Sequence, residues 1–256
     1  MLAIDLSKKI AVVTGGGSQL GRAMSVILAE CGADVAVHYH KNREQAENTA
    51  AAIRKLGRRA CVVQADVTDK ASIGAMKKEI EKELGAPDII VNNASVSDGS
   101  SWKPILEQTV ESYEGQFRSC TVQNVLMAQA FAPAMIKKKW GRIIAINTEC
   151  SMLCLPTQSN YASAKRAMDG LLRALAKEIG MHGITVNQVA PGWTISDRDR
   201  ENKSEKQEHY DKDVPLRRRG TDREIAQAVA FLASDLASFI TGLYLPVTGG
   251  NIMPTI

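Results

Sequence analysis

Short apolar runs alternate with longer amphipathic runs along almost the whole chain. Brief runs rich in Val and Ile are typical of buried strands, and apolar positions three and four residues apart are typical of helices. The expected strands are residues 10–14, 34–39, 60–64, 88–92, 142–147, 185–189 and 243–247. This alternation predicts βαβ units and therefore a parallel sheet.

Helical patterns fill the intervals between these strands. The segment "NREQAENTAAAIRKLG" ends at Gly57, "DKASIGAMKKEIEKELG" ends at Gly85, and "QSNYASAKRAMDGLLRALAKEIGMHG" is the longest. With right-handed crossovers, about seven strands give an α/β doubly wound sheet with helices on both faces, here as a single domain over residues 1–256. Ligands of such sheets bind at the carboxyl ends of the strands, near the point where the strand order reverses.

One segment departs from this alternation. Residues 196–213, "SDRDRENKSEKQEHYDKD", hold seven acidic and five Lys or Arg residues, with Tyr210 as their only bulky apolar side chain. Such a segment is either a solvated helix or loop, or a lid over a substrate pocket. Its position after the sixth strand favours a lid over residues 193–214.

Composition narrows the classes of function. The 256 residues carry a net charge of +4, and aromatic residues make up 5% of them, which argues against a nucleic-acid partner. Five cysteines without paired CxxC spacing indicate reduced thiols and a cytoplasmic location. Cys150 and Cys154 have no His at ligand spacing, so no metal site is expected. The chain shows neither a signal-peptide pattern nor an 18-residue apolar run, so no membrane partner is expected.

The stretch "TGGGSQLG" at residues 14–21 lies between the first strand and the first helix. A phosphate-binding P-loop would follow its last glycine with Lys and Ser or Thr, and Arg22 and Ala23 stand there instead. Glycines that let the backbone approach a pyrophosphate, ahead of a helix N-terminus, suit a dinucleotide better. Taken alone, the turn is a weak signal, because glycine turns also end strands for purely steric reasons.

A tyrosine and a lysine supply candidate chemistry. Tyr161 and Lys165 in "YASAK" are four residues apart, which places them on one face of a helix. A neighbouring ammonium favours the phenolate, so the pair makes a plausible proton donor to a carbonyl oxygen or base toward an alcohol. This short pattern is also common by chance.

Several motifs occur together and in order: "TGGGSQLGRA", "ADV" ending at Val67, "VNNAS", "YASAK", "VNQVAPGWT" and "VPLRRRGTDREIAQAVAFLASDLASFITG". In these motifs, over nearly its whole length, the chain resembles the short-chain dehydrogenase/reductase family, in its single-domain branch similar to 3-oxoacyl reductases. The resemblance implies a Rossmann-type fold, a nicotinamide cofactor and hydride transfer between that cofactor and a carbonyl or secondary alcohol.

The resemblance also implies roles for individual residues. Tyr161 would be the acid–base residue, Lys165 would hold the nicotinamide ribose and lower the tyrosine pKa, and Thr148, 13 residues before Tyr161, would be the catalytic hydroxyl. Asp66 would contact adenine, and Asn92 would line the cofactor floor. The full set of expected cofactor-binding residues is Gly15, Gly17, Ser18, Gln19, Leu20, Gly21, His40, Lys41, Asp66, Val67, Asn92, Ala94, Tyr161, Lys165, Pro191, Gly192 and Thr194.

Four positions depart from the family pattern. Gln19 replaces a usual glycine of the turn, Ser95 replaces the glycine after "NNA", and Thr248 replaces an acid near the end. Cys120 stands where the family has a catalytic asparagine that helps to hold a water of the proton relay. A thiol is a weak donor and acceptor, so Cys120 is more readily interpreted as a buried small hydrophobe than as a reactive group. Asn124, one helical turn later, is a candidate substitute.

These departures leave two classes of function open. The first is an active oxidoreductase, favoured by the intact Tyr161 and Lys165. The alternative is an NAD(P)-binding regulatory or low-activity protein on the same fold, which Gln19 and Cys120 keep under consideration.

The end of the second strand, "VHYHKNRE", bears on the choice of cofactor. An NAD-specific site places an acid there for the ribose 2′-hydroxyl, whereas His38, His40, Lys41 and Arg43 precede the first acid, Glu44. Cations suit a 2′-phosphate, so NADP(H) is expected over NAD(H). The competing interpretation is that these residues merely begin a solvated helix.

The substrate is expected to be a modest hydrophobic or bifunctional carbonyl compound or alcohol. The expected pocket residues are Ser95, Val96, Thr148, Cys150, Leu155, Trp193 and Ile195. By the resemblance, the assembly is expected to be a homotetramer built from helix pairs and C-terminal strands.

Overall fold

The computed structural model describes residues 3–95, 102–195 and 205–253, and in them the expected parallel sheet is found. Its seven strands are β1 (Ile10–Val13), β2 (Asp34–Tyr39), β3 (Ala60–Gln64), β4 (Ile89–Asn92), β5 (Gly141–Ile146), β6 (Ile184–Pro191) and β7 (Tyr244–Val247). They are paired in the order β3-β2-β1-β4-β5-β6-β7, with every pair parallel. The prediction of a Rossmann-type α/β doubly wound sheet is therefore confirmed.

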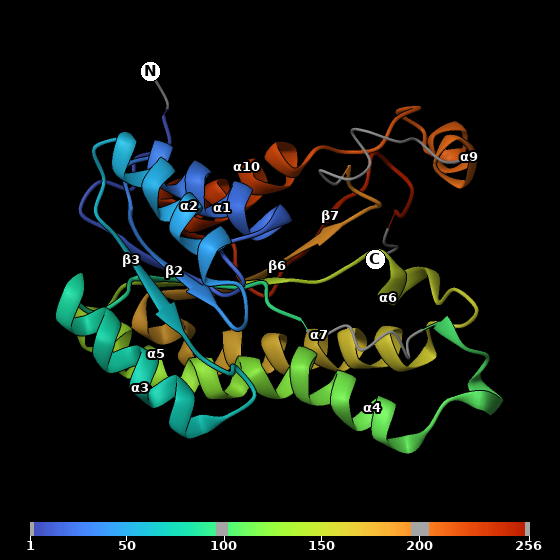
Figure 1. Ribbon diagram of the computed structural model, residues 1–256, viewed down its shortest axis with the longest axis horizontal. Coiled ribbons are helices and arrows are strands. Elements are labelled where there is room, and N and C mark those ends of the chain that lie inside the picture. Colours follow the sequence, from blue (N-terminus) through green and yellow to red (C-terminus); the bar gives the residue numbers. More distant parts are fainter. Residues whose placement is uncertain (1–2, 96–101, 196–204, 254–256) are drawn as a thin grey trace.

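Helices cover both faces of this sheet (Figure 1). The α-helices are α1 (Gln19–Glu30), α2 (Arg43–Lys55), α3 (Lys70–Glu83), α4 (Val110–Phe117), α5 (Gln123–Lys138), α6 (Cys150–Leu153), α7 (Ser159–Ile179), α9 (Glu205–Asp213) and α10 (Asp222–Ala233). Shorter turns are η2 (Ile105–Glu107), η4 (Gly180–His182) and η5 (Asp235–Ala237), and a π-helical segment, η3 (Arg118–Val122), joins α4 to α5. Helices α1, α2 and α10 lie on one face of the sheet, and α3, α5 and α7 lie on the other.

The alternation of side chains along each strand gives the molecule two apolar cores. Along β1, Ala11 and Val13 face the core under α1, α2 and α10, whereas Val12 faces the core under α3, α5 and α7. Met24 of α1 and Phe131 of α5 are among the large side chains that fill these two layers. Because both faces are covered, the strands are mostly apolar, which is why they appear as Val- and Ile-rich runs in the sequence.

The strand order reverses beside β1. The chain builds β1, β2 and β3 outward in one direction and then returns to place β4 on the other side of β1, where Val13 pairs with Val91. The loops that follow β1 and β4 therefore diverge at the carboxyl end of the sheet. This divergence opens the crevice in which ligands of such sheets bind.

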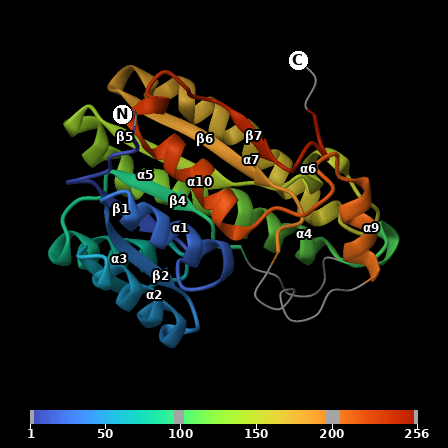
Figure 2. The same cartoon turned by 90° about the horizontal axis from the view of Figure 1, so that it is seen from above.

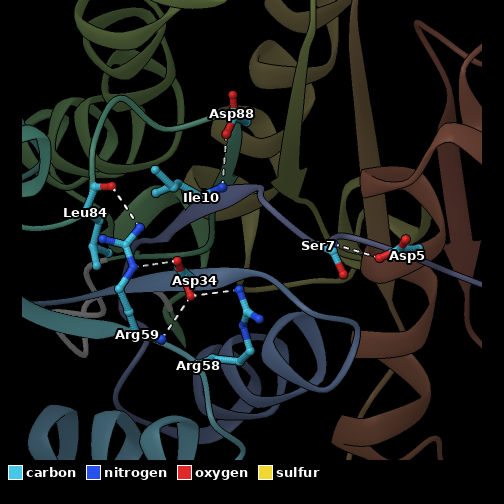
Figure 3. A network of polar contacts seen from close by, with 8 residues as sticks. All are labelled: Asp5, Ser7, Ile10, Asp34, Arg58, Arg59, Leu84 and Asp88. Atoms are coloured by element: carbon cyan, nitrogen blue, oxygen red, sulfur yellow. Dashed lines mark hydrogen bonds and ion pairs between the residues drawn. The ribbon is translucent and has the colours of Figure 1, made fainter.

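At the amino ends of the strands, opposite the crevice, ion pairs and hydrogen bonds hold the strand starts in place (Figure 3). Asp34 at the start of β2 accepts hydrogen bonds from Arg58 and from the backbone and guanidinium of Arg59, at 2.8–3.0 Å. Burial alone would raise the pKa of Asp34, but these hydrogen bonds and charges outweigh it and lower the pKa. Asp88 accepts from the backbone N–H of Ile10 at 3.0 Å. These contacts fix the strand starts far from the crevice.

The expected bounds of β2 and β3 are confirmed, and those of the other five strands shift by one or two residues. The largest difference is at β6, which continues to Pro191 instead of stopping at 189. Its last residues pair with β7, Ala190 with Pro246 and Pro191 with Val247. Strand pairing thus extends β6 beyond the apolar run that predicted it. The extension carries Pro191 and the following Gly192 into the lining of the crevice. Figure 2 shows β6 running beside β7 in the sheet.

Candidate active site

The glycine turn after β1 packs closely against its neighbours, among them the loop after β4 and the helix α2. Gly15 has a φ of +63°, a left-handed conformation that favours glycine. A Cβ on Gly17 would lie 2.8 Å from the backbone nitrogen of Ala46 in α2, and one on Gly21 would overlap the carbonyl oxygen of Gly15. Glycine at these positions lets β1, α1 and α2 approach closely. The turn is therefore a closely packed cradle at the crevice.

Two polar side chains hold this turn in place. Thr14 Oγ1 accepts hydrogen bonds from the backbone N–H groups of Asn93 and Ala94, at 2.9 and 3.0 Å, which ties the turn to the loop after β4. His38 Nδ1 accepts from the N–H of Gly15 at 3.0 Å, and its Nε2 lies 3.0 Å from the carbonyl oxygen of Ala65. These two partners assign the tautomer protonated at Nε2.

His38 was grouped in the sequence with the cations that suit a 2′-phosphate, and that interpretation is wrong. Its side chain is buried, and burial lowers its pKa to about 4, so it is neutral at physiological pH. Its role is to hold the glycine turn in place through the hydrogen bond from Gly15.

The N-terminus of α1 faces the crevice. Its N-cap residue, Ser18, makes no side-chain capping bond, so the first N–H groups of the helix are left for another acceptor. Gln19 has a φ of +46° and an exposed side chain at the crevice wall. A helix N-terminus that is uncapped and preceded by glycines fits a pyrophosphate by both its free N–H groups and its dipole.

A cavity of about 490 Å³ runs from this turn to Lys165. Most of the expected cofactor residues line it: Gly15, Ser18, Gln19, Leu20, Gly21, His40, Ala94, Tyr161, Lys165, Pro191, Gly192 and Thr194. Five do not, namely Gly17, Lys41, Asp66, Val67 and Asn92. We call this cavity the cofactor groove. Asn93, Asn147 and Asp222 line it as well, and the sequence motifs did not single them out as groove residues.

The residues after β2 and β3 lie at one end of the cofactor groove. His40 and Lys41 are exposed, and His40 lines the groove. Asp66 accepts hydrogen bonds from the backbone and hydroxyl of Thr68, which lower its pKa. Arg43 is turned toward Glu47, 3.5 Å away on α2.

Tyr161 and Lys165 lie at the other end of the groove, together with Thr148, the hydroxyl that the family resemblance implies. Helix α7 carries Tyr161 and Lys165, and Thr148 follows β5. Lys165 is buried, its Nζ donates to the carbonyl oxygen of Ile146 at 2.6 Å, and it lies 5.8 Å from the centroid of the Tyr161 ring. All three side chains line the groove.

The expected lowering of the tyrosine pKa is not found in the protein alone. Burial raises the pKa of Tyr161 above its ordinary value, the thiols of Cys120 and Cys150 raise it further, and Thr148 opposes them. Burial also lowers the pKa of Lys165. Desolvation is the largest cause of both shifts. The phenol is therefore held in its protonated form at neutral pH.

A buried polar network supports these residues from behind. Asn147 Oδ1 accepts from the backbone N–H of Thr148 at 2.9 Å, and its Nδ2 donates to the carbonyl oxygen of Lys165 and to Gln188 Oε1, at 3.2 and 2.7 Å. Gln188 Nε2 in turn donates to Asp169 at 2.7 Å, and Arg173 pairs with Asp169 at 2.9 Å. Asn147 thus connects β5, β6 and α7 directly beneath the Thr148 and Lys165 backbones.

Cys120 lies in the π-helical segment η3 and is fully buried. Its Sγ is 3.8 Å from Gln116 Oε1. Asn124 donates to the Cys120 carbonyl oxygen and accepts from Asn92 Nδ2, both at 2.7 Å. Asn92, which was expected on the cofactor floor, is therefore turned toward Asn124 and away from the groove.

A second cavity of about 800 Å³ adjoins the groove, and we call it the substrate cavity. Its described lining residues are Ser95, Trp102, Gln116, Thr148, Glu149, Cys150, Leu153, Leu155, Gln158, Tyr161, Gly192, Trp193, Tyr210, Asp213 and Asn251. Of the expected pocket residues, Ile195 lines the groove instead, and Val96 lies outside the described residues. Tyr161 and Thr148 line both cavities, so they stand where the two meet.

One wall of the substrate cavity was not anticipated. Glu149 is 4% exposed, and it accepts hydrogen bonds from Tyr210 Oη and Asn251 Nδ2, both at 2.8 Å, and from the backbone N–H of Trp193 at 3.2 Å. The rings of Trp193 and Tyr210 meet edge to face, 5.5 Å apart. The single bulky residue of the charged segment therefore reaches the substrate cavity from α9.

The described ranges contain neither a membrane-spanning helix nor a metal-binding cluster. No helix there combines the length and the apolarity needed to cross a bilayer. No group of three or more His, Cys, Asp or Glu side chains in the same residues is arranged to hold a metal ion.

Comparisons with known proteins agree with this geometry. The family model described as Enoyl-(Acyl carrier protein) reductase matches residues 16–251. The 3-oxoacyl-[acyl-carrier-protein] reductase FabG of Escherichia coli (strain K12) is 38% identical over 259 residues, which cover 98% of this chain and all of that protein. The protein of the same name from Staphylococcus aureus (strain Mu50) is 36% identical over 250 residues, covering 96% of this chain and 98% of that one.

A solved structure repeats the fold over almost the full length. The crystal structure of acetoin dehydrogenase YohF from Salmonella typhimurium superposes with a TM-score of 0.85 at 31% identity, covering 95% of this chain and 96% of that chain.

Proposed function

The chain belongs to the short-chain dehydrogenase/reductase family, and we propose that it is an NADP(H)-dependent enzyme in which Tyr161 exchanges a proton with the substrate oxygen. Membership makes it an NAD(P)-dependent oxidoreductase that acts on CH–OH and C=O groups. The preference for NADP(H) and the residue roles are the proposed part.

One observation supports the assignment of Tyr161 most strongly. The Tyr161 phenol and the Thr148 hydroxyl line both the cofactor groove and the substrate cavity. A carbonyl carbon at this junction would face the groove, where a bound nicotinamide would supply the hydride, and its oxygen would be within reach of two hydroxyl donors. Proton transfer needs such reach before it needs a favourable pKa.

The electrostatics of the pair suit reduction. Burial keeps the proton on Tyr161 at neutral pH, so the phenol begins the reaction as a donor to the carbonyl oxygen. Thr148 donates to the same oxygen and stabilises the developing negative charge. Lys165 is positioned by its bond to the Ile146 carbonyl, and it favours the phenolate that remains after the transfer.

The groove residues suggest how the cofactor is held. The glycine turn and the uncapped N-terminus of α1 would receive the pyrophosphate. His40 and Lys41, exposed after β2, would receive a 2′-phosphate, because no acid stands at this strand end to bind a 2′-hydroxyl. Pro191, Gly192 and Thr194, in the extension of β6 and just after it, would hold the nicotinamide end.

The proposal also includes a lid over the substrate cavity, a homotetrameric assembly and a cytoplasmic location. Residues 193–214 would form a lid, since Trp193 and Tyr210 contact each other across the substrate cavity. Their central part, 196–204, lies outside the described residues. Exposed apolar side chains on α4 and near the C-terminus, Phe117 and Phe239, would be covered in a cytoplasmic homotetramer.

Titration with each nucleotide tests the cofactor preference. Fluorescence of the nicotinamide should report NADPH binding at least about tenfold tighter than NADH binding, as expected for one charge-assisted hydrogen bond. His40→Ala and Lys41→Ala should reduce this ratio, whereas Lys55→Ala, at the far end of α2, should leave it unchanged. Equal affinities in the unaltered protein would overturn the NADP(H) assignment.

Ketones added to the NADPH complex then test the reaction. Oxidation of NADPH with at least one ketone supports the reductase. Nucleotide binding without turnover across a broad panel would instead favour a regulatory or low-activity protein, consistent with Cys120 in η3.

A further inference from the structure

On the described wall of the substrate cavity, the formal charges are all of one sign. Among its described lining residues only Glu149 and Asp213 carry a formal charge, and none is Lys, Arg or His. The whole chain carries a net charge of +4, so this sign is opposite to that of the molecule. The described wall is therefore a local negative region in a mildly basic protein.

The two carboxylates differ in how strongly solvent screens them. The Asp213 side chain is 68% exposed, so water attenuates its charge. Glu149 is 4% exposed. A charge shielded from water acts over a longer range than an exposed one, so Glu149 dominates the potential inside the cavity.

Among the described residues, Glu149 is stabilised by hydrogen bonds and by no ion pair. Its three donors are Tyr210 Oη, the Trp193 backbone N–H and Asn251 Nδ2, none of which carries a net charge. Arg219 is the nearby cation on the Trp193 side, 5.8 Å from that ring, and it pairs with Asp211 at 3.4 Å. The hydrogen bonds hold the carboxylate in place without cancelling its charge.

Glu149 is also adjacent in sequence to Thr148, the proposed hydroxyl donor. Its backbone N–H donates to the Pro191 carbonyl at 3.0 Å, which fixes it between the hydroxyl donor and the nicotinamide end of the groove. Any substrate whose carbonyl reaches Thr148 must bring its neighbouring groups along this wall.

We propose that Glu149 sets the charge selectivity of the substrate cavity, which accepts uncharged or cationic carbonyl compounds and excludes those with a carboxylate or phosphate close to the reacting carbon. The proposal rests on the function proposed above. A second anion about 6 Å from Glu149, at an effective dielectric constant of about 20, loses about a hundredfold in binding. The rings of Trp102, Trp193 and Tyr210 on the same cavity favour a cation further.

Three methyl ketones with one spacer test the selectivity: 5-oxohexanoate, its methyl ester and 5-(trimethylammonio)pentan-2-one. With NADPH, kcat/KM for the ester should exceed that for the carboxylate by about 30- to 100-fold, and the ammonium compound should be reduced at least as well as the ester. Equal kcat/KM values for the carboxylate and the ester, measured on the unaltered protein, would by themselves overturn the proposal.

Glu149→Gln separates charge from shape. The amide keeps an oxygen for Tyr210 and Trp193, and Asn251 can turn its own amide to accept from the new NH₂ group. The ratio of ester to carboxylate should fall by at least about tenfold, mainly through a lower KM for the carboxylate. Glu208→Gln removes an exposed charge from α9 and should leave the ratio unchanged. An active Glu149→Gln variant with the original ratio would overturn the proposal.

The same compounds distinguish this proposal from the reductase itself. Their affinities for the NADPH complex are measurable through nicotinamide fluorescence whether or not they react. If the carboxylate has the weakest affinity of the three compounds, the charge selectivity is supported even without turnover. A lack of turnover then counts against the proposed function only. A carboxylate that binds as well as the ester overturns the charge selectivity whether or not the protein turns over.

Discussion

The backbone N–H of Gly15 donates a hydrogen bond to Nδ1 of His38 across 3.0 Å, and this bond joins the glycine turn after β1 to the interior of β2. The bond requires an unprotonated Nδ1. Since the folded protein lowers the pKa of His38 from 6.5 to about 4, the unfolded chain takes up a proton more readily than the folded one. The stability that neutral His38 contributes is therefore fully present above pH 6.5 and is lost as the pH falls toward 4.

This linkage predicts an acid-sensitive fold. Between pH 7 and pH 4 the free energy of unfolding should fall by up to about 3 kcal/mol on account of His38 alone. Urea unfolding at a series of pH values measures it. His38→Asn should be less stable at pH 7 and should lose less on acidification, whereas His209→Asn, which changes an exposed histidine on α9, should follow the unaltered protein. A His38→Asn variant with the original pH dependence would show that His38 is not the titrating group.

Gln19 stores backbone strain at the mouth of the cofactor groove. Its φ of +46° is a left-handed conformation that costs a non-glycine residue about 1 kcal/mol. Gln19→Gly should therefore raise the free energy of unfolding by about 0.5–1 kcal/mol. The matched change Gln129→Gly, at an exposed position of α5, should lower it by about 1 kcal/mol. Denaturant unfolding of both variants gives the comparison, and two changes of the same sign would contradict the strain at Gln19.

Asn147 acts on Thr148 and Lys165 through their backbones. In Asn147→Ala the Thr148 N–H and Gln188 Oε1 lose buried partners, so stability should fall by about 1–3 kcal/mol. Misplaced Thr148 and Lys165 should also lower kcat about 10- to 100-fold with a smaller change in KM. Steady-state kinetics on a folded sample measure both constants, and Asn48→Ala on α2 is the surface control. A stability loss with an unchanged kcat would limit Asn147 to a structural role.

The sequence predicted the fold well because the fold depends on local patterns. Every expected strand exists, since buried parallel strands give apolar runs that are visible without tertiary information. Thr148, Tyr161 and Lys165 were predicted to lie together, and the ends of β5 and the face of α7 bring them to one cavity.

The residues that the sequence did not reveal depend on contacts between distant segments. Glu149 is bonded to Tyr210, 61 residues away, and to Asn251, 102 residues away, so its position on the cavity wall had no local signal. His38 was misread for the same reason, because its neutral state follows from burial under the glycine turn. Asn92 is withdrawn from the groove by Asn124, a partner on a different element.

The central claim is that Tyr161 transfers the proton to the substrate oxygen, and Tyr161→Phe tests it most directly. The variant removes one oxygen atom and leaves the ring, the glycine turn and Lys165 in place. Its single-turnover rate with NADPH and a ketone that the unaltered protein reduces should fall at least about a thousandfold, while the NADPH dissociation constant stays within about threefold. A rate within about tenfold of the original, with NADPH still bound, would contradict the account.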